Sequence, residues 1–178
     1  MCLKKGIPEI WKKVFWKENM KISIIAVGKL GEKYLKEGVL DYQKRIGKYC
    51  NFDIIEIKDE KNPNNASDEE TQQIKEAEAL RIKKKIKKGS TVFVLDIIGN
   101  KISSEELAQK LNSLFLEGKT DITFIIGGSL GVYDELIKEA DDTISLSDMT
   151  FPHRLTRLIL VEQIYRAFKI IKKEPYHK

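Results

Sequence analysis

The residues best suited to bind a ligand lie in two loops that are close together in the sequence. The first, Gly127–Gly131, has the sequence GGSLG after an apolar strand, and its glycines leave backbone N–H groups open to close approach by a ligand. The second, Ser147–Arg154, places hydroxyls, an acid, an aromatic ring, a proline and two bases within eight residues. A simple connection needs none of this chemistry, so we expect the functional site here.

The elements that must position these loops alternate regularly along residues 20–178. Two capping boxes, Ser67 with Glu70 and Ser103 with Glu106, mark the starts of two helices. The pattern predicts strands at 22–27, 52–57, 91–96, 121–126 and 143–146, and helices at about 32–48, 68–87, 104–116, 132–140 and 153–173. Such alternation is typical of a single α/β domain with a mainly parallel sheet of five or six strands and helices on both faces.

Three loops of this predicted domain, 95–99, 127–131 and 146–152, follow the carboxyl ends of strands. In a parallel sheet those ends share one edge, where ligands usually bind. The loops offer apolar side chains and backbone polar groups but little charge at their centre. We therefore expect a pocket that suits a flat adenine ring and a sulfonium better than a triphosphate.

Several other functional classes are disfavoured by the residues that are present. The glycines do not match the dinucleotide-binding spacing, and they follow the fourth strand instead of the first. The interpretation as a nicotinamide-dependent enzyme therefore depends on this turn alone. For the glycines by themselves, a plain strand-to-helix turn is the alternative. Two cysteines and two histidines predict neither a disulfide framework nor a metal site, which fits a reducing cytoplasm. No apolar run approaches the roughly 20 residues of a membrane span.

The end of the chain is basic, and its last helix is unusually apolar. Residues 151–178 contain seven Lys or Arg against two Glu, which equals the whole net charge of +5. This distribution predicts a polyanionic partner, with a solvated helix face as the alternative. Apolar residues cover more than half of the last helix, so either a partner subunit or the chain's own core must cover it. Beyond that helix no core packing demands an aromatic residue, so we expect Tyr176 to contact the substrate.

Residues 1–19 read as a separate segment upstream of Met20, which immediately precedes the first strand. Five apolar residues in this segment recur at helical spacing, but lysines interrupt them, so it does not resemble a secretory signal. We expect an N-terminal extension to a domain that spans 20–178.

Three stretches of the chain together resemble one known family. They are Ile126-Gly127-Gly128 with Gly131, the run Leu146–His153 with sequence LSDMTFPH, and Pro175-Tyr176-His177. Over residues 20–178 the chain resembles the bacterial ribosomal RNA large subunit methyltransferase H family. That resemblance implies methylation of N3 of a pseudouridine in 23S rRNA within the ribosome. It also implies a SPOUT fold with a C-terminal trefoil knot, S-adenosylmethionine as the cofactor, a homodimer, and a cytoplasmic location.

The same resemblance implies roles for particular residues. The cofactor would be bound by Leu95, Gly127, Leu146, Ser147, Asp148, Met149, Thr150 and Phe151. The candidates around the methyl acceptor are His153, Arg154, Tyr176 and His177, without any one of them being assigned as the base. Neither a metal nor a membrane is expected. The alternative function is a non-catalytic RNA-binding or nucleotide-binding α/β module.

Overall fold

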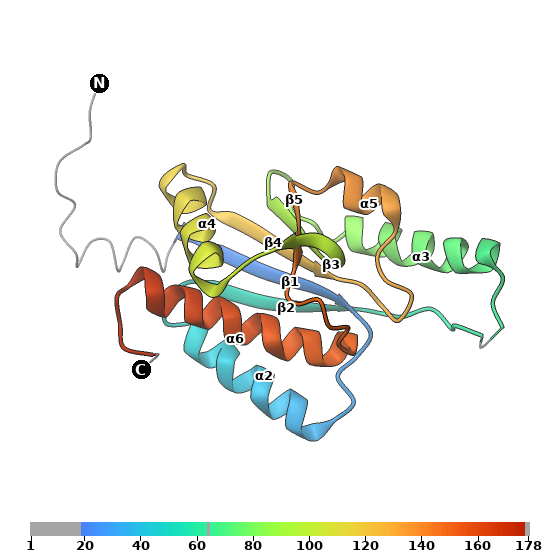
Figure 1. The fold of residues 1–178 in the computed structure, drawn as a ribbon, viewed down its shortest axis with the longest axis horizontal. Helices are drawn as coiled ribbons and strands as arrows, with labels where there is room; N and C mark the ends of the chain where they lie inside the picture. Colours follow the sequence, from blue (N-terminus) through green and yellow to red (C-terminus); the bar gives the residue numbers. More distant parts are fainter. Residues whose placement is uncertain (1–18, 64, 177–178) are drawn as a thin grey trace.

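The computed structural model describes residues 19–63 and 65–176, and these form a five-stranded parallel sheet flanked by helices (Figure 1). The strand order is β2-β1-β4-β3-β5, and each neighbouring pair is parallel. The strands are β1 Lys21–Val27, β2 Asn51–Ile57, β3 Thr91–Lys101, β4 Asp121–Ile126 and β5 Asp142–Ser145. The helices are α2 Lys33–Ile46, α3 Asp68–Lys83, α4 Ser104–Leu116, α5 Asp134–Glu139 and α6 His153–Ile171. The predicted α/β class, the five strands and helices on both faces are confirmed.

Helices cover the two faces of the sheet unequally. On one face α2, α4 and α6 pack over the side chains of Ile22, Ile24 and Phe124 (Figure 1). On the other face α3 and α5 pack over their sequence neighbours, such as Ile25 and Ile125. Alternate residues of β1 and β4 thus enter different cores, which explains why both strands are almost entirely apolar.

The helix starts follow from local capping. Ser67 and Ser103 each accept a hydrogen bond from the backbone N–H three residues on, and Glu70 and Glu106 return the bond to the Ser backbone. Both predicted capping boxes are therefore confirmed. The helix ends were predicted less well: α3 ends at Lys83, before the predicted end at about 87.

The apolar surface of α6 is explained largely by its place in the fold. The helix lies between α2 and α4 and against the sheet (Figure 1), so three sides of it meet the same chain. Leu160, Val161, Ile164 and Phe168 have no exposed surface. Of the two explanations for its wide apolar surface, burial in the chain's own core is confirmed for these residues.

One predicted element was wrong in extent. The third strand was expected to end at residue 96, with a loop over 97–102, whereas β3 continues to Lys101. The strand changes register between Leu95 and Asn100, and β5 pairs with it on both sides of that irregularity. The extra length exists because β5 supplies a partner for the second half. The expected N-terminal extension lies outside the described residues, apart from Asn19.

Candidate functional site

A cavity of about 560 Å³ opens at the carboxyl edge of the sheet. Its volume is within the range of small-molecule and cofactor sites. Its walls come from the middle of β3, from the ends of β4 and β5 and the segments after them, and from the start of α6. The lining residues are Leu95, Asp96, Ile97, Ile126, Gly127, Gly128, Ser129, Gly131, Val132, Ile144, Ser145, Leu146, Ser147, Met149, Thr150, Phe151, Pro152, His153 and Thr156.

The sheet order brings these loops together. Strands β4, β3 and β5 are adjacent and parallel, so the ends of β4 and β5 lie beside the part of β3 at Leu95, although 50 residues separate Leu95 from Ser145. The segments 127–131 and 146–152 meet at this edge as predicted, whereas 95–99 belongs to β3 and reaches the cavity through Leu95, Asp96 and Ile97. Asp96 and His153 are the only titratable residues in the lining, so the walls are mostly apolar or backbone.

The structure places most of the predicted cofactor-binding residues around this cavity. Those that line it are Leu95, Gly127, Leu146, Ser147, Met149, Thr150 and Phe151. Asp148 does not line it: its side chain is 77% exposed and its carboxylate pairs with the Lys101 ammonium at 2.7 Å. Ser147 holds the loop in place, because its hydroxyl accepts a hydrogen bond from the Met149 N–H at 3.0 Å. Ile144 and Thr156 line the cavity but were missed, since neither belongs to a recognisable motif.

Gly127 is required by the turn itself. A Cβ atom at this position would lie 2.7 Å from the carbonyl carbon and oxygen of Gly131 and 2.8 Å from the Val132 side chain. The turn closes on itself here, with an isolated bridge between Gly128 and Gly131, and Gly131 has a φ of +83°. A side chain at residue 127 would therefore force the turn open.

Gly127→Ala should lower the melting temperature and abolish ligand binding in the cavity, because the Gly131 backbone would have to move away from the new Cβ. Thermal unfolding followed by circular dichroism, together with calorimetric titration, measures both effects. Ser129→Ala, which only truncates a side chain in the same turn, is the control and should melt close to the wild type. A Gly127→Ala protein with wild-type melting and affinity would contradict this geometry.

His153 begins α6 at the rim of the cavity. Gly28 lies beside it, since a Cβ on Gly28 would be 3.5 Å from the imidazole Nε2. The pKa of His153 is lowered, first because the ring is partly buried and then because the Arg154 and Arg157 guanidinium groups repel a positive charge on the ring. Asp59 and Glu32 act in the opposite direction. The ring is therefore held in its neutral form, in which one nitrogen can accept a proton.

This lowered pKa predicts a pH-dependent stability. The folded chain binds the His153 proton less readily than the unfolded chain, so stability is lost as the pH falls through the unfolded value of about 6.5 toward the lower folded value. Urea unfolding midpoints at about pH 7.5 and about pH 5.5 should show a drop in the wild type. His153→Gln should show a smaller drop, and an identical drop would mean that His153 does not contribute.

Arg157 lies one turn further along α6 and is 1% exposed. Its guanidinium donates to Glu56 Oε1 at 2.7 Å and to the Gly28 carbonyl oxygen at 2.9 Å. Glu56 Oε1 also accepts the Leu30 N–H at 3.2 Å. Arg157 thus ties the start of α6 to the carboxyl ends of β1 and β2 and fixes the neighbouring His153. Arg154 instead pairs with Glu32 at 2.9 Å and does not line the cavity.

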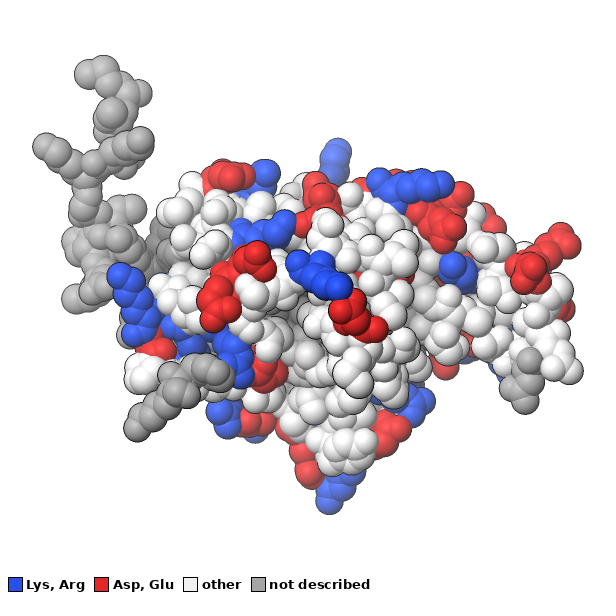
Figure 2. Space-filling model, viewed as in Figure 1, with Lys and Arg blue, Asp and Glu red and all other residues white. Residues whose placement is uncertain are grey.

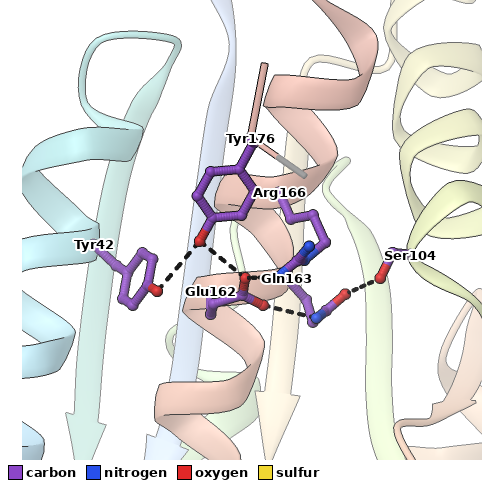
Figure 3. Close-up of polar contacts among 6 residues, drawn as sticks. All are labelled: Tyr42, Ser104, Glu162, Gln163, Arg166 and Tyr176. Atoms are coloured by element: carbon purple, nitrogen blue, oxygen red, sulfur yellow. Dashed lines mark hydrogen bonds and ion pairs between the residues drawn. The ribbon is translucent and has the colours of Figure 1, made fainter. Parts of the chain in front are cut away.

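Tyr176 follows the end of α6 and folds back along that helix toward its middle. Its hydroxyl donates to Glu162 Oε1 at 3.0 Å and lies 3.3 Å from the Tyr42 hydroxyl, as Figure 3 shows. Its ring packs edge-on against Tyr165, with a centroid distance of 5.0 Å, and Arg166 lies over it at 4.8 Å. The expectation that no packing involves Tyr176 was wrong. His177 lies outside the described residues.

Ion pairs within the chain involve several cations of the basic end. Arg166 pairs with Glu162 at 2.5 Å and Lys169 with Glu174 at 2.8 Å, in addition to the pairs of Arg154 and Arg157. These four charges are therefore not simply a solvated helix face. The charge excess is thus weak evidence for a polyanionic partner.

Two kinds of feature are absent from the described residues. No cluster of three or more His, Cys, Asp or Glu side chains in this part of the chain is arranged to hold a metal ion. No helix of the described chain has both the length and the apolar character needed to span a bilayer.

Fold and cavity together define an α/β protein with an open cavity at one edge of a parallel sheet. A family model described as "Predicted SPOUT methyltransferase" matches residues 20–177. The ribosomal RNA large subunit methyltransferase H of Acetivibrio thermocellus is 59% identical over 159 residues, which cover 89% of this chain and 100% of that protein. The chain belongs to the SPOUT methyltransferase family, with the ribosomal RNA large subunit methyltransferase H proteins.

A solved structure agrees with this fold. The crystal structure of a methylase family protein from Neisseria gonorrhoeae has a TM-score of 0.53 and 12% identity, and the match covers 99% of this chain and 91% of that one. At this identity the likeness concerns the fold alone.

Proposed function

We propose that this protein uses S-adenosylmethionine to methylate N3 of a pseudouridine in 23S rRNA within the ribosome. The observation that carries the proposal is the cavity, which the motif-bearing loops of a SPOUT methyltransferase line together. A relative 59% identical to the chain has a name that specifies methylation of large-subunit rRNA, which supports the substrate class. The site of action would be the cytoplasm, where ribosomes are found.

The residues around the cavity fit this cofactor. Leu95, Ile97, Ile126 and Leu146 supply apolar walls for an adenine ring, and the backbone groups of the Gly127 turn and the 146–151 loop supply hydrogen-bonding partners. The absence of a basic cluster from the lining disfavours a triphosphate. The bound cofactor would supply an electrophilic methyl group on a positively charged sulfur. Asp148 would contribute by fixing its loop through Lys101, since its side chain does not line the cavity.

Neutral His153 would stand at the acceptor side of the cavity. Methylation of N3 requires loss of the imino proton, and an imidazole that is kept unprotonated can accept it or orient the base that loses it. Arg154 would hold the neighbouring loop through Glu32.

We further propose that the four acceptor-side candidates meet only in a homodimer. Within one chain the Tyr176 hydroxyl is bonded to Glu162, which lies nine residues along α6 from His153, a rise of roughly 13 Å along the axis. A second copy packed antiparallel along α6 would bring its C-terminus near His153. The face viewed in Figure 2 carries an uncharged area below its centre, bounded by charged groups, and such an area can form part of an interface between copies.

The trefoil knot belongs to the same proposal. β5 runs alongside both halves of β3, on either side of the irregularity at Leu95–Asn100, and the chain then turns directly into the cavity loop. Such closeness is what a knot would produce, by drawing the segment after β5 back beside the loop after β3.

The test is methylation of purified ribosomes. Ribosomes from a strain without the homologous enzyme are incubated with the protein and S-adenosylmethionine labelled in the methyl group, and the modified nucleotide is identified by mass spectrometry. We expect one labelled 3-methylpseudouridine per large-subunit rRNA. Calorimetric titration with S-adenosylmethionine and with NAD accompanies it. Cofactor binding without methyl transfer would favour a nucleotide-binding module, and binding of NAD alone would overturn the proposal.

A further inference from the structure

A buried carboxylate lies directly behind the glycine turn of the cavity. Glu78 of α3 is 5% exposed, and its Oε1 accepts a hydrogen bond from the Glu60 N–H at 2.9 Å. No salt bridge to it occurs anywhere in residues 19–63 and 65–176. A buried acid without a cationic partner is costly, so its presence on an otherwise ordinary helix calls for an explanation.

Glu78 reaches the turn because Gly128 has no side chain. A Cβ on Gly128 would lie 3.0 Å from Glu78 Oε2 and 3.1 Å from Val27 Cγ1. Glu78 also lines a small cavity of about 40 Å³, which shares Gly128, Ser129 and His153 with the large one. The carboxylate therefore lies behind the turn that separates it from the proposed cofactor site.

The charges around Glu78 leave this region negative. Burial raises the pKa of Glu78 most, and the hydrogen bond from the Glu60 N–H lowers it. The carboxylates of Asp59 and Glu60, in the segment after β2, raise it further. Arg81 acts in the other direction, but its guanidinium is bonded to Glu60 and to the Lys58 carbonyl oxygen. His153, at the other side of the small cavity, is held neutral.

We propose that Glu78 is a specificity-determining residue that makes the site prefer the positively charged cofactor over its neutral product. This inference rests on the proposed function. S-adenosylmethionine carries a sulfonium, an ammonium and a carboxylate, for a net charge of +1. When the methyl group leaves, the bonding electron pair stays on sulfur, and the resulting thioether product has no net charge. The Glu78 carboxylate behind the turn attracts the positively charged cofactor but gives no net attraction to the neutral product, so the product is released.

Glu78→Gln removes this charge while keeping the shape of the side chain and an oxygen for the Glu60 N–H. Calorimetric titration with S-adenosylmethionine and with S-adenosylhomocysteine gives the two affinities. We expect the affinity for S-adenosylmethionine to fall about tenfold, as for charges roughly 10 Å apart at an effective dielectric constant of about 20, with the S-adenosylhomocysteine affinity unchanged. Glu76→Gln, an exposed position on the same helix, is the matched control and should change neither.

The outcomes separate the possible roles of Glu78. Equal losses for both ligands would mean that Glu78 only holds the turn in place, and unchanged affinities would mean that it has no role; each overturns the inference while the proposed function stands. A wild-type protein that binds neither ligand would remove the proposed function and the inference together.

A pH series with Glu78 left in place, in a His153→Gln background, covers the case in which Glu78→Gln fails to fold. Because the Glu78 pKa is raised, the preference for S-adenosylmethionine should grow as the pH rises and the carboxyl ionises. The other charged or titratable groups that face this region are Asp59, Glu60, Arg81 and His153. Deprotonation of His153 would also increase the preference for the positive cofactor as the pH rises. The pH series is therefore carried out on a His153→Gln protein. A preference in that background that does not change with pH would overturn the inference.

Discussion

Replacing Arg157 with alanine should lower the free energy of unfolding by about 3 kcal/mol. The guanidinium is 1% exposed, and the substitution removes its bonds to the Glu56 carboxylate and the Gly28 carbonyl oxygen. The Gly28 carbonyl oxygen would lose this donor, Glu56 would keep only its bond from the Leu30 N–H, and a void would open beneath the start of α6. Because the preceding turn of that helix carries His153, ligand binding in the cavity should be lost as well. Urea unfolding and calorimetric titration measure the two effects.

Arg154→Ala is the matched control for this experiment. Arg154 also pairs with a glutamate across the same interface, at 2.9 Å, but its side chain is 39% exposed. A pair that is open to solvent contributes about 1 kcal/mol or less, so the loss of stability should be correspondingly small. If the two alanine variants lose the same stability, burial is not what makes the Arg157 pair important.

Arg157→Lys distinguishes charge from geometry at this position. Lysine keeps the positive charge but has one nitrogen in place of the planar fork that reaches both Glu56 and the Gly28 carbonyl. We expect a stability between those of the wild type and Arg157→Ala, and weaker ligand binding in the cavity, because only one of the two partners can be bonded well. Full recovery in the lysine variant would show that the charge alone is sufficient.

The fold and the position of the cavity could be predicted because both depend on local patterns. Alternating apolar runs gave the five strands, and Ser67 and Ser103 gave two helix starts through contacts only three residues long. The glycine turn and the 146–152 loop follow the ends of β4 and β5, which lie on either side of β3, so topology alone brought Leu95, Gly127 and Phe151 to one cavity.

The features that sequence reasoning missed depend on contacts between distant segments. Arg157 shares the apolar stripe of α6 with Leu160, Val161 and Ile164, which indicates burial, but nothing in its sequence surroundings identifies Glu56 as its partner 101 residues away. Glu78 resembles any other acid on a charged helix until its contact with Gly128 is known. Tyr176 was interpreted from its position after the helix, whereas its packing against Tyr165 and Tyr42 is a property of the folded chain.

Ile164→Asp should prevent the chain from folding. The Ile164 side chain is completely buried within its own chain, where α6 packs against the sheet, and an unpaired carboxylate there should lower the stability by about 4 kcal/mol or more. Insoluble protein, or loss of the helical circular dichroism signal, is the expected result. A soluble and folded Ile164→Asp monomer would contradict the position of α6 in the core.

Ile170→Asp, on the same helix, should have the opposite consequence and tests the proposed dimer. Ile170 is 37% exposed and belongs to the part of α6 that its own chain leaves open, so a charge there need not disturb the core. If this open face joins two copies, wild-type protein should scatter light as a particle of twice 20.5 kDa, and Ile170→Asp as a folded particle of 20.5 kDa. Methyl transfer should then disappear while affinity for S-adenosylmethionine is largely kept, because Tyr176 would no longer be supplied to the His153 side of a partner. An Ile170→Asp protein that remains dimeric would place the interface elsewhere, and a monomer that is fully active would show that one chain carries a complete site.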